Sequence, residues 1–121
     1  MSIVVDESAR RVTVTAGPAF SGRVLAKAVA RMFEETPQTA SYDIVLDVRD
    51  TQTGATMEDF GIVAESYGRA PRSAERKYSC YVTLDTNYPL LAAALTHLFP
   101  DREQKFFVAP ESAHRFLDKV R

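Results

Sequence analysis

Apolar residues at the start of the chain follow the spacing of strands. The runs SIVV near residues 2–5 and RVTVTA near residues 11–16 are short and rich in β-branched residues, which is typical of β-strands. The polar stretch DESAR between them suits a hairpin turn. In the second run valines alternate with threonines, so we expect one face of the hairpin to be polar.

The residues that follow have helical spacing. Ser21 can cap a helix that ends by Pro37. The apolar stripe of this helix consists of Val24, Leu25, Ala28, Val29, Met32 and Phe33. We expect Leu25, Val29 and Phe33 to be buried against a sheet.

Three further strand–helix pairs complete the pattern. Strands are expected at YDIVLDV (42–48), KYSCYVTL (77–84) and QKFFVA (104–109). Helices are expected from near Thr56 to Gly68, from Thr86 or Asn87 to Pro100, and from Pro110 to the end, the last with Phe116, Leu117 and Val120 inward. The run Ile44, Val45, Leu46 and Val48 predicts a strand buried on both faces.

The element order is therefore β-β-α-β-α-β-α-β-α. Repeated strand–helix–strand units predict parallel strands with right-handed crossovers, and the first hairpin adds an antiparallel edge. No linker or repeat divides the sequence. We predict a single small α/β domain over residues 1–121, with a mixed, mostly parallel sheet of about five strands and four helices.

Composition limits the partners and the cellular compartment that we expect for this domain. The chain has 121 residues, 45% hydrophobic and 26% charged, with a formal net charge of -1. No basic face predicts nucleic-acid binding, and no apolar run approaches the roughly 20 residues that span a bilayer. The N-terminal MSIVVDES does not resemble a signal peptide. Cys80, the single cysteine, fits a reducing compartment, so we expect a bacterial cytoplasmic protein.

Polar residues gather where two of the expected strands end. In open α/β sheets ligands bind beyond the carboxyl ends of the strands, where helix N-termini offer free N–H groups to an anion or a carbonyl oxygen. The residues at these two strand ends are Asp50, Thr51, Thr53, Gly54 and Thr56 after the first, and Asp85, Thr86 and Asn87 after the second. We predict that they form a ligand- or partner-binding site.

Thr56 also has a purely structural explanation. The spacing of Thr56 and Asp59 is close to that of a capping box, which would account for the threonine without any function. Glu58 and Asp59 already place negative charge on the first turn of this helix. We expect Arg49 to face outward, which leaves no cation to neutralise a phosphate on Thr56.

The sequence lacks the common catalytic motifs. It has no phosphate-binding loop, no dinucleotide-binding glycine pattern and no nucleophile elbow. His97 and His114 lie on expected helices as surface or packing residues, and Cys80 fits a small core residue, so we expect no metal and no cofactor. Asp47 falls in a buried strand, and we expect it at the strand's end, bound by N–H groups of the loop.

Three tyrosines are candidates for a different kind of site. Tyr42, Tyr67 and Tyr88 could line the mouth of a pocket, with apolar rings and polar tips.

Four stretches together resemble a known family. These are IVVDESARRVTVTAG, YDIVLDVRDTQTGATMEDFGIVAESYG, KYSCYVTLD and KFFVAPESAHRFLDKV. The chain resembles the STAS domains, and within them the SpoIIAA-like proteins of the STAS/Sec14-like superfamily. In the anti-sigma-factor antagonists of this family a phosphoacceptor serine lies at a helix start, in an Asp-Ser-Ser-Gly motif. The corresponding stretch here is TGATMED, which lacks that motif and has Thr56 as its nearest hydroxyl.

Three functions follow as hypotheses. The resemblance implies a non-enzymatic regulatory or protein-interaction domain, with Thr56 as a possible phosphoacceptor, and we expect a homodimer because twofold dimers are the commonest oligomers. The alternative is a domain that binds a small molecule or lipid in an apolar cleft at the carboxyl ends of the strands. The third is an acid–base enzyme that uses Asp47, Asp50 or Asp85.

Overall fold

Consecutive strands of the sequence are neighbours in the sheet. The computed structural model describes residues 1–18, 21–50 and 55–121. Its five strands are β1 (Ser2–Asp6), β2 (Arg11–Thr15), β3 (Asp43–Asp47), β4 (Lys77–Val82) and β5 (Arg102–Phe107). They lie in the order β1-β2-β3-β4-β5, with β1 antiparallel to β2 and all later pairs parallel. The predicted small α/β domain with a mixed, mostly parallel sheet is confirmed.

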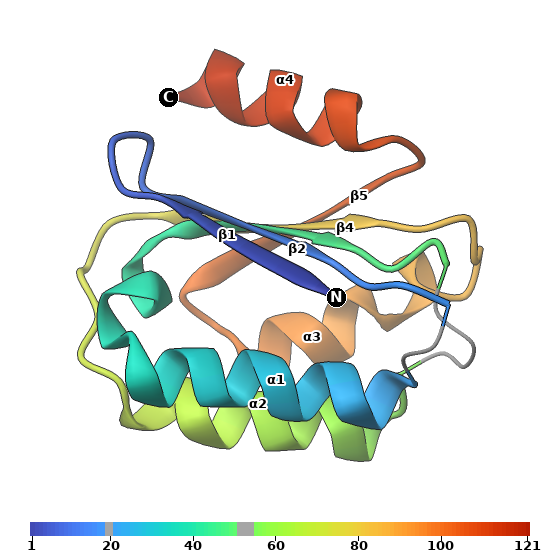
Figure 1. Cartoon of the computed structure of the whole chain (residues 1–121), viewed down its shortest axis with the longest axis horizontal. Coiled ribbons are helices and arrows are strands. Elements are labelled where there is room, and N and C mark those ends of the chain that lie inside the picture. Colours follow the sequence, from blue (N-terminus) through green and yellow to red (C-terminus); the bar gives the residue numbers. More distant parts are fainter. Residues whose placement is uncertain (19–20, 51–54) are drawn as a thin grey trace.

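Helices cover both faces of this sheet. They are α1 (Gly22–Glu35), α2 (Met57–Arg69), α3 (Ala92–Leu98) and α4 (Pro110–Val120), with short 3₁₀ helices η1 (Pro37–Ser41) and η2 (Pro89–Leu91). When strand order is consecutive, right-handed crossovers place every crossover helix on the same face. Accordingly α1, α2 and α3 lie below the sheet in Figure 1, while α4 lies alone on the opposite face.

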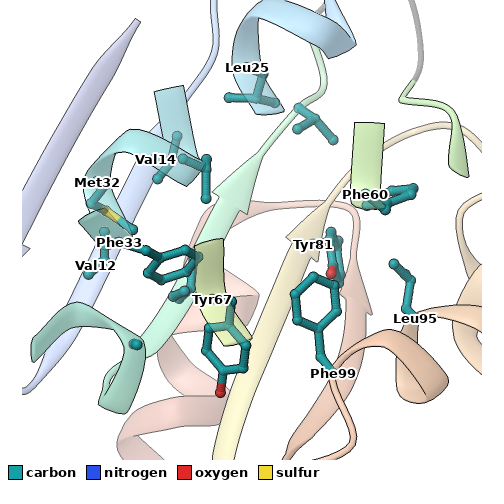
Figure 2. Close-up of a cluster of buried hydrophobic side chains, with 14 of the residues drawn as sticks. Val12, Val14, Leu25, Met32, Phe33, Phe60, Tyr67, Tyr81, Leu95 and Phe99 are labelled. Carbon is teal, nitrogen blue, oxygen red and sulfur yellow. The ribbon is translucent and has the colours of Figure 1, made fainter. Parts of the chain in front are cut away.

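Two apolar cores result from this arrangement. The larger one lies between the sheet and α1, α2 and α3, and Figure 2 draws 14 of its residues, with Val12, Met32 and Phe33 among those labelled. The smaller one lies under α4 and contains Val45 and Leu117. Ile44 belongs to the first core and Val45 to the second, which confirms that β3 is buried on both faces.

The predicted α1 stripe is largely confirmed. Leu25, Val29 and Phe33 are only 5%, 4% and 2% exposed. Val24 was expected in the same stripe, but its side chain is 45% exposed. Residues four apart lie on the same side of a helix, and Ala28, four residues on, borders a groove beside β1. Val24 therefore lies on the flank of α1 that faces the edge of the sheet.

Other boundaries differ from the predicted ones near the C-terminus. Strand β5 ends at Phe107, because Phe107 is paired with Val82, the last residue of β4, and Val108 is exposed. On α4, Leu117 is buried and Phe116 half-buried as expected, but Val120 is 41% exposed in the last turn.

The helix expected from Thr86 or Asn87 begins later. The Asp85 carboxylate accepts a hydrogen bond from the Asn87 N–H group at 2.9 Å, which closes a turn there. Tyr88 then donates its N–H to the Asp85 carbonyl oxygen, and the 3₁₀ helix η2 precedes α3.

Candidate functional site

Thr56 begins α2 with a complete capping box. Its Oγ1 accepts the N–H of Asp59 at 3.3 Å, and the Asp59 carboxylate accepts the N–H of Thr56 at 2.9 Å. This confirms the predicted pairing of these two residues. Both hydrogen bonds satisfy backbone donors that a helix start would otherwise leave free.

A cation from α1 also reaches this helix start, which the sequence did not indicate. The Arg23 guanidinium lies 2.5 Å from the Asp59 carboxylate and 3.2 Å from that of Glu58. Burial raises the pKa of Asp59, but hydrogen bonds from Arg23 and Thr56 outweigh it and hold the pKa below its ordinary value. The negative charge of Asp59 therefore joins the N-terminal ends of α1 and α2.

Asp47 lies at the end of β3, as expected, and is 7% exposed. It accepts the N–H of Arg49 at 3.2 Å, so the predicted contact with a loop N–H group is confirmed. Arg49 is exposed, as expected, but its contact with Asp47 was not foreseen. Its guanidinium folds back onto the Asp47 carboxylate at 3.0 and 2.9 Å, because a buried carboxylate needs a charged partner.

The remaining predicted site residues lie on the surface at the carboxyl edge of the sheet. Asp50, Thr56, Asp85, Thr86 and Asn87 are exposed. Asp85 donates its N–H to Thr83 Oγ1 at 3.0 Å and accepts from Asn87, so its hydrogen bonds stay within its own loop. Thr51, Thr53 and Gly54 lie outside the described residues. The described members form a surface edge, and none of them lines the cavity described next.

An apolar cavity of about 70 Å³ lies between the sheet and the helices of the larger core. Its wall includes Leu25, Val29 and Phe33 from α1, Phe60, Val63 and Tyr67 from α2, and Ile44, Leu46, Ser79 and Tyr81 from the sheet. Ala55 and Asp59 border it near the start of α2. The cavity thus extends under α2 from the edge where the two helices begin.

Tyr81 is the most informative residue in this wall. Its side chain rises from β4 between Phe60, Phe99 and Leu95 (Figure 2), and the residue is only 6% exposed. Its ring stacks on Phe106 with the centroids 5.3 Å apart. Within the described part of the chain, no hydrogen bond engages its hydroxyl group. Burial raises the pKa of Tyr81, so the phenol is neutral at physiological pH.

Two of the three tyrosines predicted to line a pocket do so. Tyr67 and Tyr88 are part of the cavity wall. Tyr42 is not, because its hydroxyl donates to the Glu7 carboxylate after the first hairpin strand. Burial raises the pKa of Tyr67 and of Tyr88, and in Tyr88 the backbone N–H of Ala55 partly opposes this.

A buried cation closes the other end of the cavity. Arg102, at the start of β5, is 4% exposed and lines the wall. All five of its N–H donors are used, by Ser79 Oγ, the Tyr67 hydroxyl and the carbonyl oxygens of Ala40, Tyr42 and Tyr78. The guanidinium is therefore committed to the protein and has no donor left for an anion.

The alternation of residues along β4 could have indicated that Ser79 and Tyr81 belong to this site. Ser79 and Tyr81 alternate with Cys80 along β4, so they lie on one face and Cys80 on the other. Cys80 belongs to the smaller core, where burial raises the pKa of its thiol to about 12, as fits a small core residue. Nothing in the local sequence indicated that Arg102 would point inward.

No family model, curated protein or solved structure matches this chain. Among residues 1–18, 21–50 and 55–121, no group of three or more histidine, cysteine, aspartate or glutamate side chains is placed to hold a metal ion. In the same ranges, no helix combines the length and apolar character needed to cross a membrane.

Proposed function

We propose that this domain binds a small, mostly apolar and neutral molecule in the cavity under α2. The observation that carries the proposal is the apolar cavity itself, whose wall includes Tyr81, a residue that is only 6% exposed and whose hydroxyl has no hydrogen bond to a described residue. A hydroxyl without a protein partner beside a cavity can form its hydrogen bond with a ligand or an ordered water there.

The size and charge of the cavity limit the ligand. Its volume of about 70 Å³ is roughly half that of a dry engineered cavity, about 150 Å³, that accepts benzene. A short alkyl group fits without rearrangement, whereas a long acyl chain would have to displace α2. Because Arg102 has no free donor, the chemistry favours a neutral hydroxyl or carbonyl over a carboxylate as the polar group that meets Tyr81.

A chemical-shift titration of backbone amides tests this proposal. The probes are straight-chain alcohols from ethanol to octanol and the carboxylic acids of equal length. We expect saturable shifts at residues that line the cavity, an optimum at short chains, and weaker binding of the acids. A probe at about 100 times its dissociation constant would also stabilise the fold by roughly 2.7 kcal/mol.

Two neighbouring positions on α2 provide a matched pair of variants. Val63→Phe places a ring in the cavity and should abolish the shifts. Ile62→Phe places the same ring outside it and should leave them unchanged, because Ile62 borders a surface groove. Shifts that persist in Val63→Phe, or no saturable shift with any probe, would count against the proposal.

A second candidate is a regulatory protein-interaction domain of the STAS type in a bacterial cytoplasm. It is favoured by apolar residues at the edge where the polar site was predicted: Leu84 is 69% exposed and Val108 is 67% exposed. These residues follow neighbouring strands, and the N–H of Thr83 donates to the carbonyl oxygen of Phe107 at 2.9 Å. Exposed apolar residues next to polar ones often mark binding surfaces.

Pull-down from an extract of the source cells tests this second candidate. A partner of this edge should be retained by the wild type and lost with Leu84→Asp or Val108→Asp. Val24→Asp, an equally drastic change on α1, should retain it. Equal retention by all three variants would remove the edge as a docking surface.

We also propose that two copies of the chain associate.

A further inference from the structure

The outer edge of β1 is open for hydrogen bonding. On β2, the Arg10 carbonyl accepts from Asp43 and the Ala16 N–H donates to Asp47, so even-numbered residues there bond toward β3. Odd-numbered residues of β2 therefore bond toward β1, where Thr13 is opposite Val4. It follows that the backbone groups of Ile3 and Val5 point away from the sheet.

This edge lacks the usual protection against pairing. Edge strands are commonly shielded by proline, lysine, a bulge or a covering element. The sequence of β1 is SIVVD, with Asp6 as its only charged residue. Ile3 is 37% exposed and Val4 is 58% exposed, and Met1 just before the strand is 44% exposed. Apolar side chains thus flank a row of free backbone donors and acceptors.

A groove runs between this strand and α1, which lie side by side in the same direction (Figure 1). Its apolar lining comes from Ile3, Val5 and Met32, and its charged rim from Lys27, Arg31 and Glu35. Glu35 is exposed and pairs with Arg31 at 2.7 Å. Lys27 has no carboxylate within ion-pair distance among the described residues. The rim therefore carries a lysine without an ion-pair partner at one end and a carboxylate paired with Arg31 at the other.

We propose that β1 pairs antiparallel with β1 of a second copy, about a twofold axis at Val4, so that the two sheets become continuous. Ile3 then lies opposite Val5 of the second copy, and the two exchange both backbone hydrogen bonds. Val4 meets its own equivalent in a non-hydrogen-bonded pair, with the Cα atoms about 4.5 Å apart. A twofold axis at Ile3 or at Val5 would place only that residue opposite a member of the set Ile3, Val4 and Val5. The register centred on Val4 therefore brings the most of these apolar residues together.

The charges of α1 favour a second copy over an unrelated strand. The twofold axis reverses α1, so Lys27 of one copy approaches Glu35 of the other, while Arg31, midway between them, approaches its own equivalent with its charge already paired by Glu35. Helix α1 covers β2, and the two β2 strands would be three strand spacings apart, about 14 Å. An α-helix with its side chains is about 10–12 Å wide, which leaves a gap that lysine and glutamate can bridge. The surface is separate from the cavity and rests only on the proposed association of two copies.

Cysteine cross-linking of the full chain tests the register. Val4→Cys should form a disulfide-linked dimer under mild oxidation, because the pair lies within the Cα separation that a disulfide allows. Ser2→Cys is the matched control. In this register Ser2 of one copy lies opposite Asp6 of the other, so the two Ser2 residues are four positions apart along the strands, about 14 Å. Native Cys80 is fully buried and common to both variants.

Sedimentation of the reduced proteins distinguishes pairing through β1 from association of two copies through some other surface. The wild type should show a concentration-dependent dimer, which Val4→Lys abolishes and Leu90→Lys, at an exposed residue of η2, retains. A dimer that persists in Val4→Lys, or equal cross-linking of Ser2→Cys and Val4→Cys, would overturn this surface while leaving association intact. A wild type that stays monomeric at every concentration would overturn both.

Discussion

The guanidinium of Arg121 lies 2.7 Å from the carboxylate of Asp43, although 78 positions separate the two residues. Asp43, at the start of β3, is 2% exposed and also accepts the N–H of Tyr78 at 3.0 Å. A second arginine nitrogen donates to the same carboxylate at 2.8 Å. The last residue of the chain therefore ties α4 to the middle of the sheet.

Removing this arginine should weaken the fold. Arg121→Ala leaves the buried Asp43 carboxylate with one backbone donor, and we expect the free energy of unfolding to fall by about 1–3 kcal/mol. Arg115→Ala is the control, because Arg115 is exposed on the same helix and forms no ion pair with any described residue. Chemical denaturation measures both, and equal midpoints would show that the contact contributes no net stability.

Truncation of a side chain in the apolar stripe of α1 should also lower the free energy of unfolding. Leu25 is 5% exposed and already borders the cavity, so Leu25→Ala enlarges an existing void. We expect a loss of about 2–5 kcal/mol, which is the usual range for leucine truncation in a core. Val24→Ala, at the exposed neighbouring position, should change the free energy of unfolding by less than about 0.5 kcal/mol. Urea titration of the two variants checks the difference.

Asp101 should make part of the stability depend on pH. Burial raises its pKa, but hydrogen bonds from Arg72 and Tyr67 outweigh it and hold the pKa below the ordinary value of 3.8. The folded state then binds fewer protons than the unfolded state around that pH, so the contribution is complete above 3.8 and is lost as the pH falls through the folded pKa.

Comparison of the wild type with Asp101→Asn tests this sign. The wild type should be more stable at neutral pH, and the difference should narrow as the pH is lowered below 3.8. Asp50→Asn removes one exposed negative charge and controls for the change in net charge. A difference that stays constant between neutral and acidic pH would contradict the role given to Asp101.

Cys80 should be unreactive in the folded protein. It is fully buried, and its thiol has a pKa raised to about 12, so almost no thiolate is present at neutral pH. A thiol reagent should therefore label it only after unfolding. Labelling at the rate of a free thiol under native conditions would show that the smaller core opens readily.

The element order was predictable because it depends on local spacing. The helical stripe through Leu25, Val29 and Phe33 and the unbroken apolar run of β3 are short-range patterns, and the structure confirms both. The end of β5 was misplaced because it depends on where β4 ends, through the pairing of Val82 with Phe107. Strand ends are set by a partner that the local pattern does not contain.

The candidate site was less predictable for the same reason. Thr56 and Asp59 form a local motif, so their hydrogen bonds could be foreseen. The partners of Arg102 come from residues up to 62 positions away, and the contact between Arg23 and Asp59 spans 36 positions. Long-range contacts of long, flexible side chains leave no periodic trace in the sequence. Tyr81 was visible only as one more aromatic residue of a strand.

Thr56 gives the last prediction, because capping and phosphorylation make opposite demands on its hydroxyl. In the structure the hydroxyl accepts the N–H of Asp59, and Asp59 and Glu58 share the guanidinium of Arg23. Arg49, the other nearby cation in the sequence, is held by Asp47. A phosphate on Thr56 would therefore meet two carboxylates and compete for cations that are already paired.

Capping should thus dominate the effect of mutations at this position. Thr56→Ala should lower the free energy of unfolding by about 0.5–2 kcal/mol, and Thr56→Ser, which keeps the acceptor oxygen, should be nearly neutral. Denaturation of the two variants measures this. Incubation with a cell extract and radiolabelled ATP tests the phosphoacceptor hypothesis, with Thr56→Ala as the unlabelled control. Stoichiometric label on Thr56 that also changes partner binding would show that the hydroxyl serves as a switch, because a cap alone needs no phosphate.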